Sequence, residues 1–209
     1  DILAVRPLKK GVIENVAQAQ ALLIKAMQIG IEEGESVGRI VIGIPGDSSE
    51  VEKNAAEEIG RKAGAENILV ISEGLAAAIG AGLPVEEATG SMVVDIGGGT
   101  TEIAVISLGG IVTSCSIRIG GDEMDSSIIQ YIKREYNLLI GERTAEEIKI
   151  NIGTAIVNPN QDKTMDIRGR DLVSGLPKTV RIKSSEICEA LSEPVHKIVD
   201  AVKGTLEKT

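Results

Sequence analysis

The stretch that decides the fold runs from Val93 to Glu102, with the sequence Val-Val-Asp-Ile-Gly-Gly-Gly-Thr-Thr-Glu. A β-rich segment ends at Asp95 and Ile96, three glycines and two threonines follow, and a second β-rich segment continues to Ile106. This pattern predicts two strands joined by a tight turn that carries almost no side chains.

Such a turn allows a polyanion to touch the backbone. Glycines without a Cβ atom can take φ > 0 and direct successive N–H groups into one concavity, which cradles a phosphate. Asp95, at the end of its strand, is placed to meet the divalent cation that accompanies nucleotide phosphates. Thr100 and Thr101 add hydroxyls for a phosphate oxygen or a water. The glycines alone fit a simple polar hairpin equally well, but the flanking acid and threonines favour phosphate.

Composition limits the class of protein. The chain has 209 residues, enough for one sizeable core or two small ones, and 43% of them are hydrophobic without a run of membrane-spanning length. A formal net charge of −9 disfavours nucleic acid and anionic lipid as partners. Aromatic residues make up only 1%, so base stacking on aromatic rings is nearly unavailable.

Cysteine and histidine content argues against a zinc site. Cys115 and Cys188 lie far apart without a CxxC pattern, and His196 is the single histidine. We expect both cysteines to be buried, reduced and structural, as in a cytoplasmic protein, and His196 to lie on the surface. The chain begins at Asp1 without a methionine or a signal peptide, so we expect a piece of a longer protein.

The first third of the chain alternates strands and helices. We expect strands over 2–5, 39–44 and 67–71, an amphipathic helix over 15–31, and a helix opened by a Ser49–Glu52 capping box and ending near 61–63. The nearly continuous apolar strands predict a sheet covered on both faces. The strand–helix–strand order predicts a parallel pair.

Glu73 stands between the strand over 67–71 and a helix of small residues over 75–82. A carboxylate at the carboxyl end of a strand lies where open α/β sheets bind their ligands. On local evidence, an acid that stabilises the helix N-terminus is an equally good interpretation.

The rest of the chain predicts a meander followed by helices. Three antiparallel strands extend to Ile119, and a helix over 124–136 could receive an anion at its N-terminus. A capping box of Thr144 and Glu147 predicts a helix that ends at Ile152. Short strands over 165–168 and 179–182 and two separate helices, one from Ser184 or Ser185 and one over 193–208, complete the expectation.

Residues 94–102 resemble the second phosphate hairpin of the actin and Hsp70 superfamily of ATPases. The runs 90–108, 117–122 and 140–146 are similar to the MreB family, the bacterial actins of cell shape, and the likeness extends over nearly all 209 residues. The resemblance implies an α/β, actin-like (ribonuclease H-like) two-lobed ATPase fold, present here in part. It also implies three regions: a remainder of the first lobe with an interdomain helix (1–85), subdomain IIA with the phosphate hairpin (86–143 and 194–209), and subdomain IIB (144–193).

The resemblance further implies roles for individual residues. Asp95 would coordinate Mg²⁺, and Glu73 would orient the attacking water with help from Thr100, because positioning and charge neutralisation dominate phosphoryl transfer. The other residues implied to bind ATP fall into three groups. The phosphates would be held by Gly97, Gly98, Gly99, Thr100 and Thr101; Gly120, Gly121 and Asp122 would lie beside the nucleotide; and the ribose and base would be reached by Glu146 and Lys149.

As a function, the resemblance implies Mg-dependent ATP binding and hydrolysis coupled to polymerisation into filaments that organise cell shape and wall synthesis. The implied partners are further copies and cytoskeletal or envelope proteins, without nucleic acid. The implied location is the cytoplasm, with membrane association of the full-length protein left open. One alternative is a filament or interaction module with a vestigial or incomplete nucleotide site. A chaperone ATPase or a sugar kinase is disfavoured, because no sugar-binding or peptide-binding segment is recognised.

This chain departs from the family pattern at three places. The first phosphate hairpin and the later adenosine loop of the family have no counterpart in it. Gly74 stands where the family usually has a proline after the catalytic glutamate, which predicts a less rigid Glu73. Residues 30–38 are acidic and lack aromatic side chains, so we expect little direct membrane contact from this part.

Overall fold

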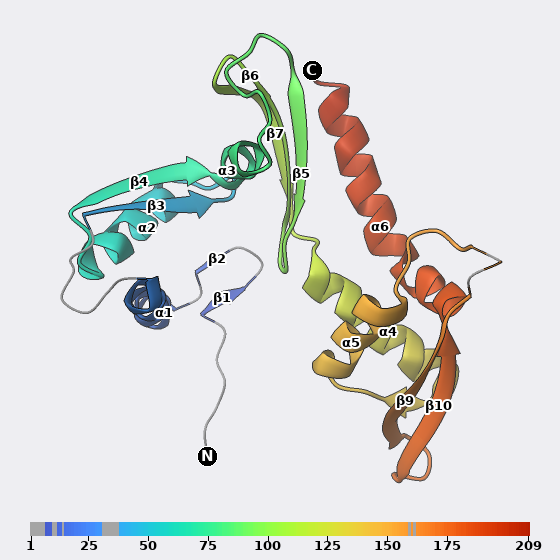
Figure 1. Ribbon diagram of the computed structural model, residues 1–209. Coiled ribbons are helices and arrows are strands. Elements are labelled where there is room, and N and C mark those ends of the chain that lie inside the picture. Colours follow the sequence, from blue (N-terminus) through green and yellow to red (C-terminus); the bar gives the residue numbers. More distant parts are fainter. Residues whose placement is uncertain (1–6, 10–11, 14, 31–37, 159, 161) are drawn as a thin grey trace. The chain divides into compact units, whose positions relative to one another are not determined.

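A computed structural model describes residues 7–9, 12–13, 15–30, 38–158, 160 and 162–209 (Figure 1). The chain forms two compact units. The first unit comprises Asp1–Ile96, Thr100–Arg118 and Val202–Thr209, and the second comprises Gly97–Gly99 and Ile119–Ala201. The three regions predicted from the family resemblance follow a different division and stay a prediction.

Among its described residues, the first unit contains three small sheets together with helices. Its elements in the described residues are β1 (Leu8–Lys9), β2 (Val12–Ile13), α1 (Val16–Gly30), β3 (Arg39–Ile44), α2 (Glu50–Lys62), β4 (Asn67–Ser72), α3 (Glu73–Gly80), β5 (Ser91–Ile96), β6 (Thr101–Ser107) and β7 (Gly110–Ile117). Strands β3 and β4 are parallel, and β5, β6 and β7 form an antiparallel meander with β6 in the centre. The predicted parallel pair and meander are confirmed.

Local signals explain where α2 begins. The Ser49 hydroxyl accepts a hydrogen bond from the Glu52 N–H, and the Glu52 carboxylate accepts one from the Ser49 N–H, so the predicted capping box is confirmed. Gly60 of this helix lies against the parallel sheet, because a Cβ atom there would come within 3.0 Å of Ile40 Cδ1 and 3.1 Å of Ile68 Cγ1. Helix α2 therefore covers the face of the sheet that carries these isoleucines.

The other face of the β3–β4 sheet is exposed in the described structure. Val41 and Leu69 expose 55% and 53% of their surface. The prediction of a sheet covered on both faces is therefore wrong for this chain. An apolar run in the sequence indicates a strand that can be buried on both faces, but it does not show whether a helix of this chain covers each face.

The central strand of the meander is the core of the first unit. Ile103 to Ile106 of β6 are buried, and α3 packs on this strand through its small residues. Gly74 makes the closest approach, since a Cβ atom on it would lie 2.8 Å from the Ala104 Cβ. The missing side chain at position 74 therefore allows α3 to lie directly on β6.

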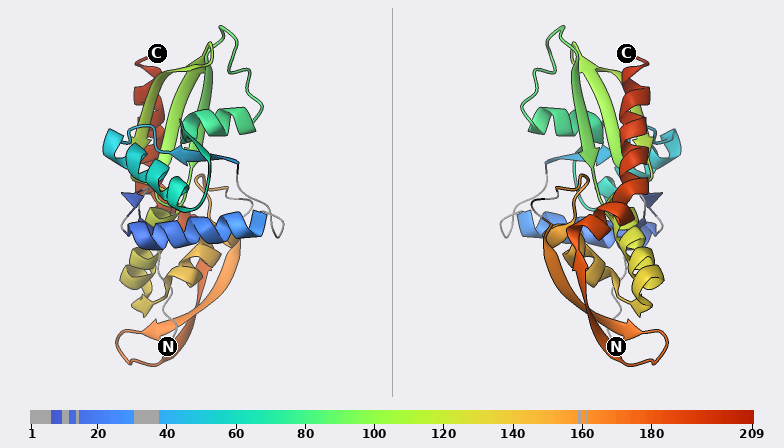
Figure 2. Two further views of the ribbon diagram at one scale, coloured as in Figure 1. Left: turned by 90° about the vertical axis from the view of Figure 1, so that its left-hand side faces the viewer. Right: turned by 90° about the vertical axis from the view of Figure 1, so that its right-hand side faces the viewer.

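The second unit packs helices around a small sheet. Its elements in the described residues are α4 (Gly121–Tyr136), β8 (Leu138–Leu139), α5 (Glu142–Ile152), β9 (Thr164–Asp171), β10 (Pro177–Lys183) and α6 (Ser184–Leu206), of which the last five residues belong to the first unit. The sheet has the order β10-β9-β8, and β9 and β10 form a long twisted hairpin (Figure 2). The core combines isoleucines and leucines of both helices, the sheet and α6.

Two helix predictions are wrong in this unit. Helix α5 begins at Glu142 with Gly141 as N-cap and without a side-chain cap, since the Glu147 carboxylate accepts from Arg143 instead of closing a box with Thr144. Helix α6 is continuous, with Pro194 inside it. A proline removes one helical hydrogen bond, but the apolar side chains buried on both sides of it, such as Leu191 and Ile198, hold the two halves in one helix.

Both tyrosines of the chain lie on α4 and face α6. The Tyr131 hydroxyl donates to Glu189 over 3.4 Å, and the Tyr136 hydroxyl donates to Glu186. Burial, together with the neighbouring carboxylates, raises the pKa of Tyr131 to about 12 and that of Tyr136 to about 12.

Several smaller expectations can be compared with the structure. Cys115 and Cys188 are free thiols but only half-buried, so the prediction of full burial is wrong. His196 is exposed, as predicted. The strand predicted over 2–5 lies outside the described residues. Within the described ranges, no helix combines the length and apolar character that crossing a bilayer requires.

The contact between Gly74 and Ala104 leads to a first prediction. Gly74→Ala forces a methyl group against β6 and should lower the free energy of unfolding by about 1–3 kcal/mol. Gly80→Ala, at the end of the same helix with nothing within 4 Å of an added Cβ, should leave stability unchanged or raise it. Urea unfolding monitored by circular dichroism measures both, and equal effects would contradict the close packing of α3 on β6.

Candidate functional site

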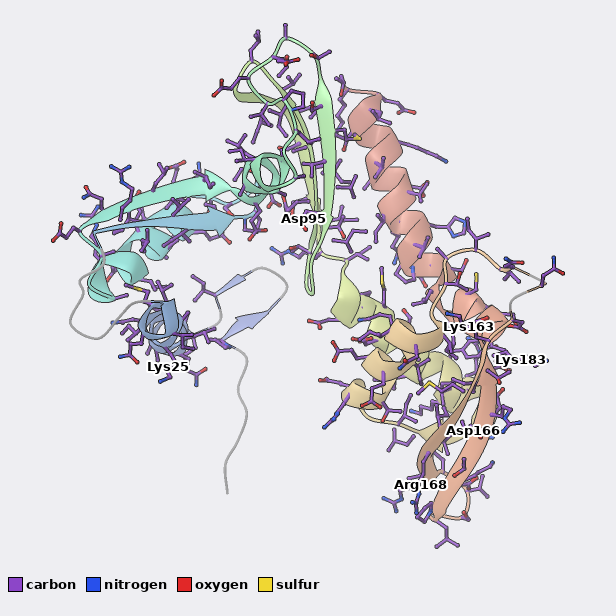
Figure 3. The ribbon with its side chains drawn as sticks, in the orientation of Figure 1. Lys25, Asp95, Lys163, Asp166, Arg168 and Lys183 are labelled. Atoms are coloured by element: carbon purple, nitrogen blue, oxygen red, sulfur yellow. The ribbon has the colours of Figure 1, made fainter. Side chains whose placement is uncertain are left out.

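Three carboxylates gather in the first unit at the ends of its strands. Asp95, near the end of β5 (Figure 3), and Glu102 of β6 are directly opposite each other in the antiparallel ladder. Glu73 follows β4 as the first residue of α3. Burial raises the pKa of Glu73, and the charges of Glu102 and Asp95 raise it further. Like charges this close repel one another, so the arrangement favours binding of a cation.

Glu102 is the buried member of this group, with 3% of its surface exposed. One carboxylate oxygen accepts the Gly46 N–H over 3.1 Å, and the other accepts the Ser116 hydroxyl. Glu102 therefore ties the turn after β3 to the meander. The sequence motif does not single out Glu102 as a site residue, although an acid within a run of buried strand residues indicates a specific role.

Glu73 also borders a cavity of the first unit. The cavity has a volume of about 550 Å³ and lies between α1, α2 and β3, with a lining that is mostly apolar. Gly43 of β3 lies beside Glu73, since a Cβ atom there would be 3.3 Å from Glu73 Cγ. This apolar wall is the physical cause of the partial desolvation of the Glu73 carboxylate.

The glycine turn belongs to the second unit, where its carbonyl groups are held by α4. The Gly121 N–H donates to the Gly97 carbonyl over 2.9 Å, and the Asp122 N–H donates to the Gly98 carbonyl over 2.8 Å. A Cβ atom on Gly120 would lie 2.5 Å and 2.7 Å from the same two carbonyl oxygens. The first two N–H groups of α4 are thus occupied by the turn and are not available to an anion.

The N–H groups of the turn, unlike its carbonyl groups, are not bound by α4. Within the described part of the chain, the Gly98 and Gly99 N–H groups donate to no protein atom. The expected φ > 0 is wrong at Gly98, because the described glycines with positive φ are Gly64, Gly82, Gly109 and Gly175. The close approach therefore requires glycine at position 120, whereas a Cβ atom on Gly98 would meet only Asp122 Oδ1, at 4.0 Å. Two N–H groups of the turn stay available to a ligand.

The two threonines of the turn differ in accessibility. Thr100 is half-buried, and Thr101, the first residue of β6, is fully buried. A hydroxyl contact with a phosphate is therefore easier at Thr100 than at Thr101.

Lys149 of α5 lies at the start of α4. Its Nζ atom donates to the Gly121 carbonyl over 3.1 Å and to Asp125 over 3.0 Å, and both charged side chains are largely buried, with 21% and 13% exposed. Glu146, one turn earlier on α5, is exposed and forms no ion pair with a described residue. Lys149 thus fixes the N-terminal turn of α4, and Asp125 is a partner that the sequence did not reveal.

The carboxylates near the end of β5 could supply one or two ligands to a metal ion. Among the described residues, no group of three or more His, Cys, Asp or Glu side chains is arranged around a metal position. Mg²⁺ commonly binds one or two carboxylates and takes its other ligands from waters and substrate phosphates. Asp95 is exposed and forms no ion pair with a described residue, so it fits this role.

Comparison with known proteins identifies the family of this chain. The family model described as MreB/Mbl protein matches residues 1–209. The chain belongs to the MreB/Mbl family. Its resemblance to the bacterial actins is therefore confirmed over the whole sequence.

Relatives in the MreB/Mbl family are similar over most of this chain. The cell shape-determining protein Mbl of Bacillus subtilis (strain 168) is 47% identical over 210 residues, which are 100% of this chain and 63% of that protein. A crystal structure of MreB5 of Spiroplasma citri bound to ADP has a TM-score of 0.91 and 40% identity, covering 98% of this chain and 61% of that one. The MamK double helical filament has a TM-score of 0.79 at 21% identity, covering 96% and 61% respectively, and shows the fold alone.

The fold is therefore actin-like, as predicted for the MreB/Mbl family. The chain spans about three-fifths of the length of these relatives. The roles assigned to the individual site residues stay predictions.

The position of Glu73 predicts a pH dependence. Its raised pKa means that the charged form is disfavoured in the folded state, so its favourable contribution exists below the unfolded-state pKa of 4.5 and is lost as the pH rises through the folded-state value. Glu73→Gln should therefore raise Tm at pH 7 by about 1–3 °C, a gain limited by solvent screening, and should have no effect near pH 4. Glu86→Gln, in an exposed loop, is the control. A pH-independent difference would refute the desolvated position of Glu73.

The pair of Lys149 and Asp125 gives another prediction. Lys149→Met leaves a largely buried carboxylate without its partner and should cost about 1–3 kcal/mol of stability, with strong coupling in a double-mutant cycle with Asp125→Asn. Arg143→Met breaks the exposed pair with Glu147 on the same helix, where Arg143 is 92% exposed, and should change stability by less than about 0.5 kcal/mol. Thermal unfolding compares the two, and a coupling near zero would contradict the role of Lys149 at α4.

Proposed function

We propose that the protein containing this chain is a bacterial actin-like ATPase, which binds and hydrolyses Mg-ATP and assembles into filaments that organise cell shape. The observation that carries the proposal is the glycine turn, whose carbonyl groups are bound to α4 while the Gly98 and Gly99 N–H groups have no acceptor in the described chain. Backbone N–H groups presented in this way bind phosphate oxygens without a lysine.

Nucleotide binding is the first part of the proposal. The S. citri relatives were solved with ADP and with AMPPNP, and they share 40% and 39% identity with this chain. In this chain the β- and γ-phosphates would contact the turn over Gly97 to Thr101. The side chain of Thr100 is the more accessible of its two hydroxyls.

Mg²⁺ would be held by Asp95, directly or through water. When bound, the ion neutralises charge on the phosphates. The chain supplies an exposed carboxylate for it, with Glu102 opposite in the ladder adding negative charge. The absence of three-ligand groups in the described residues fits a cation that takes most of its ligands from water and phosphate.

Glu73 would orient the attacking water and accept its proton, and Thr100 would help to position it. The partly desolvated carboxylate, with its pKa raised by burial and by the neighbouring carboxylates, is better suited to proton transfer than a fully solvated glutamate. The packing of Gly74 on Ala104 fixes the start of α3 and with it the Glu73 backbone. This contact would limit the freedom that Gly74 gives Glu73, and the lower rigidity expected without the proline of the family stays a prediction.

The ribose and base would be contacted from the second unit. Asp122 and Glu146 are exposed there, and Gly120 packs directly against the carbonyls of the turn. The Lys149 amine is already bound to Gly121 and Asp125, so we assign it a positioning role at the start of α4. Filament assembly is proposed by analogy with the actin-like relatives, among them the MamK filament.

Two variants test the proposal in the complete gene product. Titration with a fluorescent ATP analogue should show binding that Asp95→Asn weakens by about tenfold in Mg²⁺ and hardly at all in EDTA. Glu73→Gln should retain nucleotide binding but lower phosphate release by about a hundredfold or more. Glu86→Gln, an exposed acid of the first unit, should match the wild type in both measurements.

Two outcomes would contradict this assignment. Unchanged phosphate release in Glu73→Gln would remove Glu73 from the mechanism. Filament assembly without detectable nucleotide binding would favour the alternative of an interaction module with a vestigial site.

A further inference from the structure

Glu102 is a buried carboxylate in the central strand of the meander. It exposes 3% of its surface and forms no ion pair with a described residue. Buried charges in proteins are usually paired with an opposite charge or bind a metal, so a buried carboxylate without a cation needs another explanation. The surroundings of Glu102 suggest a role in the candidate site.

The antiparallel ladder places the Glu102 side chain in a row with two others. Glu102 of β6 pairs with Asp95 of β5 on one side and with Ser116 of β7 on the other. Directly opposite residues of an antiparallel sheet point to the same face. The three side chains therefore lie next to one another across one face of the meander.

Helix α3, which begins at Glu73, packs on this same face (Figure 1). Ala104 lies two residues after Glu102 on β6, so both side chains point to the same side of the strand. A Cβ atom on Gly74 of α3 would lie 2.8 Å from the Ala104 Cβ atom. Glu73 directly precedes Gly74, and it therefore lies close to Glu102. The pKa of Glu73 agrees with this placement, since burial raises it first and the charge of Glu102 raises it next.

The Glu102 carboxylate joins the meander to the parallel sheet. One oxygen accepts the N–H of Gly46, in the turn after β3, over 3.1 Å, and the other accepts the Ser116 hydroxyl. A Cβ atom on Gly46 would lie 3.6 Å from Glu102 Oε2 and 3.6 Å from Ser72 Oγ. Ser72 ends β4 and directly precedes Glu73, so Glu102 holds the parallel sheet at the edge from which Glu73 emerges.

We infer that Glu102 is a positioning residue for ATP hydrolysis, which fixes Glu73 relative to Asp95. It does so by binding the turn at Gly46 and the hydroxyl of Ser116. This inference rests on the ATPase activity proposed above and adds a residue to the same site. Glu73 would orient the attacking water and Asp95 would hold the metal, so the rate of cleavage depends on their separation. Because Glu102 is buried, it acts through these two side chains.

Two conservative variants of Glu102 in the complete gene product separate positioning from charge. Glu102→Asp keeps the negative charge, but its side chain is one methylene shorter and does not reach Gly46 and Ser116 together. Glu102→Gln loses the charge and keeps both bonds, since its amide oxygen can accept from the Gly46 N–H and its NH₂ group can donate to the Ser116 hydroxyl.

Single-turnover cleavage of Mg-ATP and titration with a fluorescent ATP analogue measure the effect. Glu102→Asp should slow cleavage about tenfold or more while changing nucleotide affinity less than about twofold, because misplaced catalytic groups lose rate before binding. Glu102→Gln at saturating Mg²⁺ should stay within about threefold of the wild-type rate. Ile182→Val shortens a fully buried side chain of the second unit and is the control for lost stability, with cleavage expected at the wild-type rate.

The pattern of rates and affinities decides the outcome. Wild-type cleavage by Glu102→Asp would overturn the inference and leave the proposed function intact. Slow cleavage by Glu102→Gln, with or without slow cleavage by Glu102→Asp, would assign the role to charge and also overturn positioning. A loss of affinity in Glu102→Asp as large as its loss of rate would show a general disturbance of the fold and would overturn the inference as well. Absence of ATP binding and cleavage in the wild type would overturn both the inference and the proposed function.

Discussion

The close backbone contact between the glycine turn and α4 is the constraint on which the candidate site depends. Gly120 approaches the carbonyls of Gly97 and Gly98 so closely that position 120 tolerates no side chain, and the first N–H groups of α4 then bind those carbonyls. Because the carbonyl side of the turn is satisfied, its N–H side is left for a ligand. Lys149 supports the arrangement from α5 through the Gly121 carbonyl.

The first unit uses a second constraint, the burial of β6. Strand β6 must accept α3 on one side, which explains the small residues of that helix and the missing side chain at Gly74. The same strand carries Glu102, whose two oxygens bind the Gly46 N–H and the Ser116 hydroxyl. Glu73, which follows β4, and Asp95, near the end of β5, are thereby positioned by the packing of the backbone elements that carry them.

Much of this architecture could be predicted where the cause is local. The capping box at Ser49, the parallel pair and the meander depend on neighbouring residues, and each is confirmed. The failures have a tertiary cause: the continuity of α6 through Pro194 depends on side chains buried against other elements. The bonds of Glu102 to Gly46 and of Lys149 to Asp125 join residues 56 and 24 positions apart, a distance that periodicity does not reach. The motif predicts the glycine turn, but it does not predict the packing of Gly120 against the carbonyls of that turn.

The placement of both tyrosines has a practical consequence for spectroscopy. Tyr131 and Tyr136 lie in the second unit against carboxylates of α6, and the chain has no tryptophan or phenylalanine. Ultraviolet emission and near-ultraviolet dichroism therefore observe the second unit alone, whereas the far-ultraviolet spectrum averages the peptide bonds of both. Melting curves that coincide by the two methods would indicate one cooperative transition, and curves that separate would give the order in which the units unfold.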